Sequence, residues 1–264
     1  SGSSPVEDIS NARLTKAISE KKFFASSDPS DISVASVVII CVPTPLDVVR
    51  EPDLDLLESA AKDVAPHLSF GTLLVSESTS YPGTLRDVII PLVNSLKSAD
   101  ASEIFYASAP ERVNPGDPVW DQKNTPRLVG GIDEESEKRA LAFYNSICDS
   151  VVATSTPEIA EAAKILENTF RLVNIAMINE FTQLCSAQGI NVHEVINAAA
   201  TKPYGFMPFR PGVGIGGHCI PVDPLYLTWW ARKNGSRAEF VENWKRDLNK
   251  IYTKPEPGEL PIVP

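Results

Sequence analysis

The 264-residue sequence has no apolar run that approaches the roughly 18 residues of a membrane helix. Its N-terminus, SGSSPVEDIS, lacks the basic and apolar regions of a secretory signal. It has no sustained stripe of Lys and Arg, and its net charge is −10, so it is poorly suited to neutralising nucleic-acid phosphates. We therefore expect a soluble cytoplasmic protein that binds neither membrane nor nucleic acid. Small anionic substrates stay possible, because a few local cations suffice for them.

Cysteine is scarce, and none of the four cysteines stands in a CxxC or other metal-ligand spacing. This spacing argues against both a disulfide scaffold and a zinc site, so we expect no metal. Cys41, Cys148 and Cys185 lie in apolar runs and are expected in the core. Cys219 differs, because it lies among glycines and beside His218.

The composition is that of a globular protein, with 43% hydrophobic and 22% charged residues, and the length suffices for about two domains. From residue 36 to about 153, short apolar runs alternate with amphipathic stretches. This alternation is typical of βαβ units and predicts a doubly wound, Rossmann-like parallel sheet. Strands are expected over 36–42, 72–78, 103–108, 127–131 and 150–154, with helices over 52–68, 82–97 and 133–148.

Beyond residue 154 the pattern becomes helical, which predicts an all-helical second domain. Helices are expected over 157–188, 191–200 and 223–235, with a break at Gly189 and a Gly- and Pro-rich loop over 203–224. The last helix is expected to have Asp223 as N-cap and Gly235 as C-cap. The expected domains are thus 1–154 (α/β), 155–252 (helical) and a Pro-rich tail over 253–264.

The stretch GVGIGGHCIPVDP contains a G-x-G-x-x-G pattern on Gly212, Gly214 and Gly217. A dinucleotide fingerprint needs a strand before it and a helix directly after it, whereas PYGFMPFRP is a poor strand and Pro221 delays the helix. The glycines are better explained by close approach of the backbone to a ligand. Cys219 lies just ahead of a predicted helix N-terminus, which favours a nucleophilic thiolate; a buried structural cysteine fits the local features equally well.

Three further segments carry polar residues that a site could use. In the long predicted helix, Lys164, Asn168 and Arg171 recur at i, i+4 and i+7 and share one face, as a solvated polar stripe would also do. Asn in mid-helix is a poor helix former and indicates a local reason. In the predicted α/β domain, Ser78, Thr79 and Glu111 follow predicted strands, where doubly wound sheets bind ligands, although turn chemistry also explains these residue types.

Five motifs occur in the order and spacing of one enzyme family: CVPTP (41–45), STSYPGT (78–84), PERVNPGD (110–117), AAKILENTFRLVNIAMINE (162–180) and GIGGHCIPVDP (214–224). The chain resembles the nucleotide-sugar (UDP-glucose/GDP-mannose) dehydrogenases over roughly residues 4–240. The ENTFR and GGHCIPVDP segments are similar to the branch that acts on UDP-N-acetylhexosamines, with a gluco or manno sugar.

The resemblance implies an oxidoreductase of polysaccharide biosynthesis that oxidises the sugar C6 hydroxyl to a carboxylate in two hydride transfers to NAD. It implies that Cys219 holds the intermediate aldehyde as a thiohemiacetal and then as a thioester. Lys164 and Asn168 would stabilise the oxyanion. Asp223, Glu111 and Thr79 would transfer protons and position the hydrolytic water.

The resemblance also implies a homodimer through the long central helix. In addition, it assigns residues to the two ligands. The nucleotide-sugar residues would be Arg171, Tyr204, Phe206, Arg210, Gly212, Gly214, Gly216, Gly217 and His218, and the NAD residues would be Val42, Pro43, Thr44 and Ser78.

The printed sequence departs from the family pattern at both ends. The family begins with a strand and a G-x-G-x-V-G turn and ends in a second Rossmann-like domain that binds UDP, and neither is recognisable here. We therefore expect the printed chain, with a partial NAD-binding domain, to bind NAD poorly and to turn over little substrate. The alternative hypotheses are a non-catalytic dimerisation or binding module, and a cysteine hydrolase using Cys219 and His218.

Overall fold

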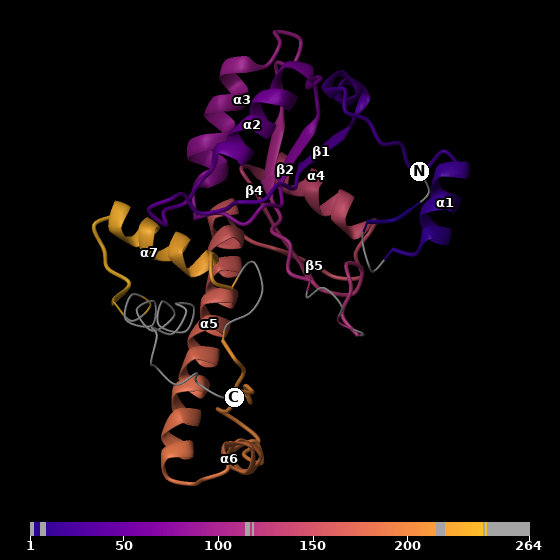
Figure 1. The fold of residues 1–264 in the computed structure, drawn as a ribbon. Coiled ribbons are helices and arrows are strands. Elements are labelled where there is room, and N and C mark those ends of the chain that lie inside the picture. The colour runs from indigo at the N-terminus through magenta and orange to yellow at the C-terminus, as the bar shows by residue number, and fades with distance from the viewer. Residues whose placement is uncertain are drawn as a thin grey trace. The chain divides into compact units, whose positions relative to one another are not determined.

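A computed structural model describes residues 3–5, 9–113, 117, 119–214, 220–239 and 241. The chain forms two compact units: the first comprises Ser1–Thr44 and Leu54–Lys164, and the second comprises Pro45–Asp53 and Ile165–Pro264. The predicted fold class is confirmed, because a mostly parallel sheet with helices precedes a helical region (Figure 1). Among the described residues no helix is both long enough and apolar enough to cross a membrane.

The sheet of the first unit contains all five predicted strands, in the order β1-β2-β3-β4-β5. β1, β2 and β3 are mutually parallel, and so are β4 and β5. β4, however, runs antiparallel to β3, with Ala107 opposite Gly131, which departs from the parallel sheet that we predicted. A parallel return needs a crossover connection, usually a helix, and the described residues between β3 and β4 form none. The strands are β1 (Val37–Ile40), β2 (Leu73–Ser76), β3 (Phe105–Ser108), β4 (Arg127–Gly131) and β5 (Val151–Ala153).

Helices cover both faces of this sheet (Figure 1). Along β2, Leu74 packs into one hydrophobic cluster with α2 and α3, while its neighbours Leu73 and Val75 pack into another with α4. Side chains of a strand alternate between its two faces, so a central strand that is covered twice is apolar throughout. The unit is therefore doubly wound. The helices are α2 (Asp55–Val64), the 3-10 helix η2 (Ala65–His67), the π-helix η3 (Leu85–Ile89), α3 (Ile90–Leu96) and α4 (Glu134–Asn145).

Two short helices precede β1 and were not predicted: α1 (Asn11–Ser19) and the 3-10 helix η1 (Pro29–Val34). α1 is capped by Ser10, whose side chain accepts a hydrogen bond from Arg13 N, and it buries none of its residues. Its apolar residues Leu14, Ala17 and Ile18 recur at i, i+3 and i+4, a helical spacing that the prediction did not use.

Glycine is needed where β4 meets the helices that follow it. A Cβ atom at Gly131 would lie 2.3 Å from the backbone nitrogen of Glu137 in α4. A Cβ atom at Gly130 would lie 2.5 Å from the carbonyl oxygen of Thr156. Both distances are too short for a side chain, so the glycine pair of RLVGG allows this close packing.

The second unit contains most of α5 (Pro157–Ala187), all of α6 (Val192–Ala199) and all of α7 (Asp223–Lys233). α5 ends at the predicted break: Gly189 has φ +68°, Gly189 N donates to Ser186 O, and Ile190 N donates to Cys185 O. This pair of bonds is a Schellman motif, which requires a left-handed residue. α7 ends in the same way at Gly235, whose φ is +70°.

The start of α7 differs from the prediction. Its N-cap is Val222, and Asp223 is the first helical residue. No side chain of the described residues caps the helix; the Asp223 carboxylate instead accepts a hydrogen bond from Asn168. The expected N-cap role of Asp223 is therefore wrong, because a partner on another helix engages its side chain.

The cysteine prediction holds for two of the three residues expected in the core. Cys148 and Cys185 are buried, but Cys41 is exposed. Cys41 directly follows β1, which is paired with β2 and forms one end of the described sheet. Ile39 in the same strand is also exposed, so an apolar run does not ensure burial at the edge of a sheet.

Candidate functional site

In the first unit, the candidate site is the sheet edge where β1, β2 and β3 end. These strands are parallel, so the segments after their carboxyl ends meet at one edge, the usual ligand position of a doubly wound sheet. Ser78 Oγ donates to Val42 O at 2.8 Å and accepts from Val42 N at 2.9 Å. Thr44 Oγ1 donates to Thr79 O at 2.6 Å. The structure thus brings four predicted residues together and joins the two segments; Pro43 between them is exposed.

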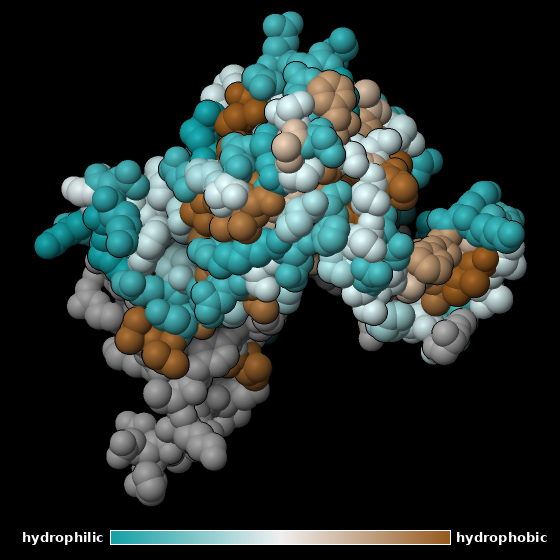
Figure 2. All heavy atoms as spheres, turned by 90° about the horizontal axis from the view of Figure 1, so that it is seen from above, coloured by the Kyte–Doolittle hydropathy of each residue, from teal (hydrophilic) through white to brown (hydrophobic). Residues whose placement is uncertain are grey.

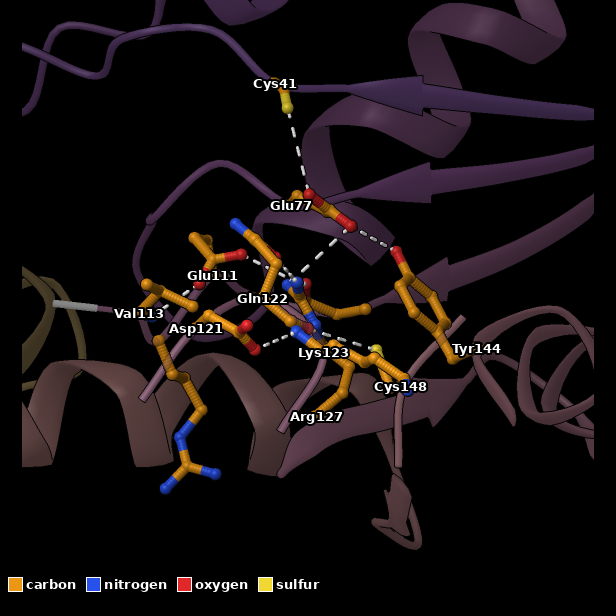
Figure 3. Close-up of polar contacts among 12 residues, drawn as sticks. Cys41, Glu77, Glu111, Val113, Asp121, Gln122, Lys123, Arg127, Tyr144 and Cys148 are labelled. Atoms are coloured by element: carbon orange, nitrogen blue, oxygen red, sulfur yellow. Dashed lines mark hydrogen bonds and ion pairs between the residues drawn. The ribbon is translucent and has the colours of Figure 1, made fainter. Parts of the chain in front are cut away.

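Glu111, in the segment after β3, is held by an arginine that the sequence analysis did not single out. Arg127 Nη2 donates to Glu111 Oε2 at 2.6 Å, and Val113 N donates to Glu111 Oε1 (Figure 3). The Arg127 side chain is 6% exposed, whereas the Glu111 side chain is 33% exposed. The arginine is therefore buried beneath a carboxylate that remains partly open to solvent.

The charge of Arg127 affects the protonation of Glu111. Burial by itself would raise the pKa of Glu111, but the positive charge of Arg127 and the hydrogen bonds to the carboxylate outweigh it. The pKa of Glu111 is consequently lowered from its ordinary value. Glu111 is thus an ionised hydrogen-bond acceptor at neutral pH.

Glu77 extends this network toward α4 and β1. Tyr144 OH donates to Glu77 Oε1 at 2.5 Å, and Arg127 Nη1 lies 3.6 Å from the same oxygen (Figure 3). Cys41 Sγ lies 3.8 Å from Glu77 Oε2. Burial and the neighbouring Glu77 carboxylate raise the pKa values of both the Tyr144 hydroxyl and the Cys41 thiol. Cys41 is therefore a poor nucleophile despite its exposure.

The segment after β2 is also fixed by Glu161, near the start of α5. Gly83 N and Leu85 N donate to the two carboxylate oxygens of Glu161 at 2.7 and 3.1 Å. Burial raises the pKa of Glu161 to about 8, although these two amide bonds act in the opposite direction. Ser80 Oγ, in the same segment, is buried and has no hydrogen-bond partner in the part of the chain that the structure describes.

In the second unit, two of the predicted catalytic residues contact each other. Asn168 Nδ2 of α5 donates to Asp223 Oδ2 at the start of α7, and both residues are buried. A buried, hydrogen-bonded asparagine explains the mid-helix Asn better than a solvated stripe does. Two other members of the predicted stripe differ, since Arg171 is exposed and Lys164 is half-buried.

The predicted substrate loop is joined to α5 by a second asparagine. Asn179 Oδ1 accepts from Gly212 N at 3.0 Å, and Asn179 Nδ2 is buried with no partner among the residues described. Arg210 Nη2 donates to Asn197 Oδ1 at 2.6 Å. Tyr204 and Phe206 are exposed.

Four predicted site residues lie outside the described residues: Gly216, Gly217, His218 and Cys219. Their neighbours in the chain are described. Ile220 packs with Leu172 and Ala176 of α5, and Gly214 has φ +155°. The extended φ of Gly214 is a conformation that side-chain-bearing residues rarely adopt.

The sequence analysis did not identify Arg127 or Asn179. Both carried a signal, because each is a polar residue inside an apolar pattern: Arg127 opens the RLVGG strand, and Asn179 interrupts the apolar run of α5. A polar residue in such a place needs a partner when it is buried.

Both units together define a class of protein. The first has the architecture of a Rossmann-type nucleotide-binding domain, with polar residues at the carboxyl ends of its parallel strands. The second is helical and contains the buried Asn168–Asp223 pair, in which Asp223 lies at the end of the glycine-rich loop in the sequence. This combination is typical of two-domain dehydrogenases.

Comparison with known proteins identifies the family. Residues 1–148 match the NAD binding domain, and residues 158–250 the central domain, of the UDP-glucose/GDP-mannose dehydrogenase family. The chain belongs to this family. It is 38% identical over 213 residues to UDP-N-acetyl-D-glucosamine 6-dehydrogenase of Pseudomonas aeruginosa, covering 80% of this chain and 50% of that protein.

One further relative and one solved structure show a comparable similarity to the chain. UDP-N-acetyl-D-mannosamine dehydrogenase of Pyrococcus horikoshii is 37% identical, covering 84% of this chain and 53% of its own length. The solved structure of a UDP-D-ManNAc dehydrogenase from that organism has a TM-score of 0.83 at 34% identity, covering 93% of this chain and 57% of that one. The chain thus spans about half the length of the curated relatives it matches.

Proposed function

We propose that the protein carrying this chain catalyses the NAD-dependent oxidation of a UDP-N-acetylhexosamine at C6, giving the uronate through an intermediate on Cys219. The observation that carries the proposal is the buried Asn168–Asp223 pair. Both residues belong to motifs that the family resemblance assigns to catalysis, and they contact each other across two helices of the second unit. The relatives named above support the substrate class, since their names specify UDP-N-acetylglucosamine and UDP-N-acetylmannosamine.

The residues at the sheet edge of the first unit fit a dinucleotide. Pro43 is exposed and Val42 partly so, which leaves apolar surface available next to the strand ends. The buried Ser80 Oγ has no partner among the described residues and can accept or donate a hydrogen bond. Val42, Pro43, Thr44 and Ser78 would lie along NAD, which when bound supplies the hydride acceptor.

The chemistry explains the residue types. In the first oxidation a base removes the C6 hydroxyl proton while C6 loses a hydride, which gives an aldehyde. The Cys219 thiolate adds to the aldehyde carbon to form a thiohemiacetal, and loss of a second hydride and a proton converts this into a thioester. Attack of water on the thioester releases the carboxylate and regenerates the thiol. One sugar therefore consumes two NAD and one water.

Each step needs a group that this chain can supply. Lys164 and Asn168 would stabilise the oxyanion that develops on the sugar oxygen. Glu111 and Asp223 would move protons to and from the substrate and the hydrolytic water, which Thr79 would position. Arg171, His218, Arg210, Tyr204 and Phe206 and the glycines of the loop would contact the nucleotide sugar.

A homodimer through α5 is part of the proposal. Within the second unit, Asn168, Leu172 and Ala176 are buried on one side of α5. Exposed apolar side chains lie on the opposite side of α5. They are spaced by three, four or seven residues and form a stripe suited to a partner helix. They are Leu166, Phe170, Met177, Phe181 and Leu184. The same stripe favours the second candidate, a non-catalytic dimerisation module that has kept the catalytic residues.

A stoichiometric assay separates the two candidates. The protein is incubated with excess NAD and a limiting amount of UDP-N-acetylglucosamine or UDP-N-acetylmannosamine, and NADH and uronate are counted. The dehydrogenase proposal expects two NADH for each uronate, and no uronate from a Cys219→Ala variant, which lacks the thiol needed for the second oxidation. The absence of NADH with either sugar, from a protein that is folded and dimeric, would favour the dimerisation module.

A further inference from the structure

We propose that Arg127 is a positioning residue for Glu111, holding its carboxylate ionised and oriented at the edge where β1, β2 and β3 end. The direction of β4 makes this possible. Because β4 runs antiparallel to β3, its first residue, Arg127, lies beyond the carboxyl end of β3. In a parallel arrangement the start of β4 would lie at the opposite edge. The inference rests on the proposed function, in which Glu111 transfers a proton.

A single guanidinium fixes the segment after β3 at several points (Figure 3). Arg127 Nη1 donates to Ala109 O at 3.2 Å, and Nη2 donates to Glu111 Oε2 at 2.6 Å and to Gln122 Oε1 at 2.7 Å. The planar fork of arginine can reach these acceptors together, whereas the single ammonium of lysine presents a point charge without that geometry. Arg127 therefore sets both the position and the direction of the Glu111 carboxylate.

Glu111 keeps acceptor capacity for a reacting group. An ionised carboxylate has about four lone-pair sites. Val113 N engages Oε1, Arg127 engages Oε2 and the Gln122 side chain also hydrogen-bonds to the carboxylate, so about one of the four sites remains for a further donor. Since a third of the side chain, 33%, is exposed, a water or a substrate hydroxyl can approach it from the open side.

Arg127 also faces a second carboxylate, and the cationic Arg112 donates to the neighbouring Pro126 O at 2.8 Å. Glu77, after β2, lies 3.6 Å from Arg127 Nη1 and accepts from Tyr144 of α4, while Cys41 Sγ lies near Glu77. Arg127 supplies the positive charge that faces both Glu77 and Glu111. Without it, two carboxylates would face each other through a buried region, which favours protonation of one of them.

The test measures the protonation of Glu111 directly. The chain is labelled with glutamate bearing carbon-13 in the side-chain carboxyl, and NMR titrations follow Glu111, assigned by the signal missing in Glu111→Gln. In Arg127→Gln the pKa of Glu111 is expected to rise by about 1 to 3. In Arg127→Lys the rise is smaller, because the charge remains. Arg86→Gln is the matched control, since Arg86 pairs with Glu158 and should leave the titration of Glu111 unchanged.

Kinetics give a second readout on the active protein. Arg127→Lys should lower kcat at least tenfold while the KM for UDP-sugar stays within about twofold, because the orientation of Glu111 is lost and not the binding of the sugar. Titration of Glu111 at the wild-type pKa in Arg127→Gln would overturn the inference. If that variant does not fold, an unchanged kcat in Arg127→Lys overturns it. A shifted pKa in a protein that oxidises no UDP-sugar supports the inference and counts against the proposed function alone.

Discussion

The first unit holds its candidate site segments with charge, whereas the second unit holds them with neutral amides. In the first, one buried arginine from β4 reaches Glu77 and Glu111, which follow two other strands. In the second, Asn168 and Asn179 of a single helix bind Asp223 and Gly212 on either side of the loop that contains Cys219. Strand ends from different parts of the chain converge, so one long side chain can join them. Asn168 and Asn179 are eleven positions apart, so they lie on one face of the helix and about 16 Å apart along it. One short amide at each position therefore suffices to hold a segment on each side of the loop.

The surface differs from these interiors. On the face drawn in Figure 2, hydrophobic side chains gather in small groups separated by hydrophilic ones. Charge is also buried in the interior, at Arg127, whose side chain is 6% exposed. Four substitutions test whether the charged contacts of the first unit and the amide contacts of the second hold their sites as described.

The largest expected effect is that of Arg127→Met. It leaves Glu77 and Glu111 without their cation and should lower the free energy of unfolding by about 3 kcal/mol, the low end for breaking a buried ion pair, because Glu111 is partly exposed. Urea unfolding followed by circular dichroism measures it. Arg86→Met, which breaks a more exposed pair with Glu158, is the control and should cost under about 1 kcal/mol. Equal losses of unfolding free energy in the two variants would show that Arg127 stabilises the fold no more than Arg86 does.

Asn168→Ala is expected to come next. The buried Asp223 carboxylate loses a donor, and the free energy of unfolding should fall by about 2 kcal/mol. NADH formation should fall by about two orders of magnitude if Asn168 also stabilises an oxyanion. Glu180→Ala, an exposed position on the same helix, serves as the stability control. A loss for Asn168→Ala no larger than that of the control would show that the amide contact is unimportant.

Glu161 gives the first unit an unusual pH response. Its pKa in the folded protein is about 8, against an ordinary 4.5, so the folded state binds more protons between these pH values. Its contribution to stability is therefore fully present below pH 4.5 and is lost as the pH rises toward 8. Glu161→Gln should flatten the decline of the melting temperature across this window. An identical pH profile in wild type and variant would contradict the assignment.

The smallest effect is expected for Asn179→Ala. Gly212 N loses its acceptor, but the amide Nδ2 that is removed has no partner among the described residues, so the cost should be about 1 kcal/mol. Asn197→Ala, which removes an exposed bond to Arg210, should stay within about 0.5 kcal/mol. Hydrogen exchange at Gly212 reports the contact itself: protection should fall in Asn179→Ala only. Unchanged protection would mean that Asn179 does not hold the loop.

Much of the fold was predictable because local pattern decides it. The apolar runs of β2 and β3 fix two buried strands, and Gly189 and Gly235 fix the ends of helices through their left-handed conformation. The direction of β4 was not predictable in this way, since pairing direction depends on the connection and not on the strand's own residues. α1, by contrast, was predictable: Leu14, Ala17 and Ile18 recur at helical spacing, and the prediction did not use them.

The candidate site divides in the same way. Motif spacing led to Asn168, Asp223 and Glu111, and the structure gives each a specific partner. Arg127 was missed because its importance arises from the antiparallel strand that carries it past the end of β3. Asp223 was misjudged as an N-cap, since its local context fits a cap and its actual partner lies far away in sequence.

The central claim, that Cys219 belongs to a site for a UDP-N-acetylhexosamine, is tested most directly by thiol labelling. In a chain with Cys41→Ser, Cys148→Ala and Cys185→Ala, Cys219 is the remaining thiol, and its labelling rate is followed against pH with and without UDP-sugar. The account predicts rapid, pH-dependent labelling that UDP-N-acetylglucosamine or UDP-N-acetylmannosamine slows. Slow labelling that neither sugar changes would contradict it.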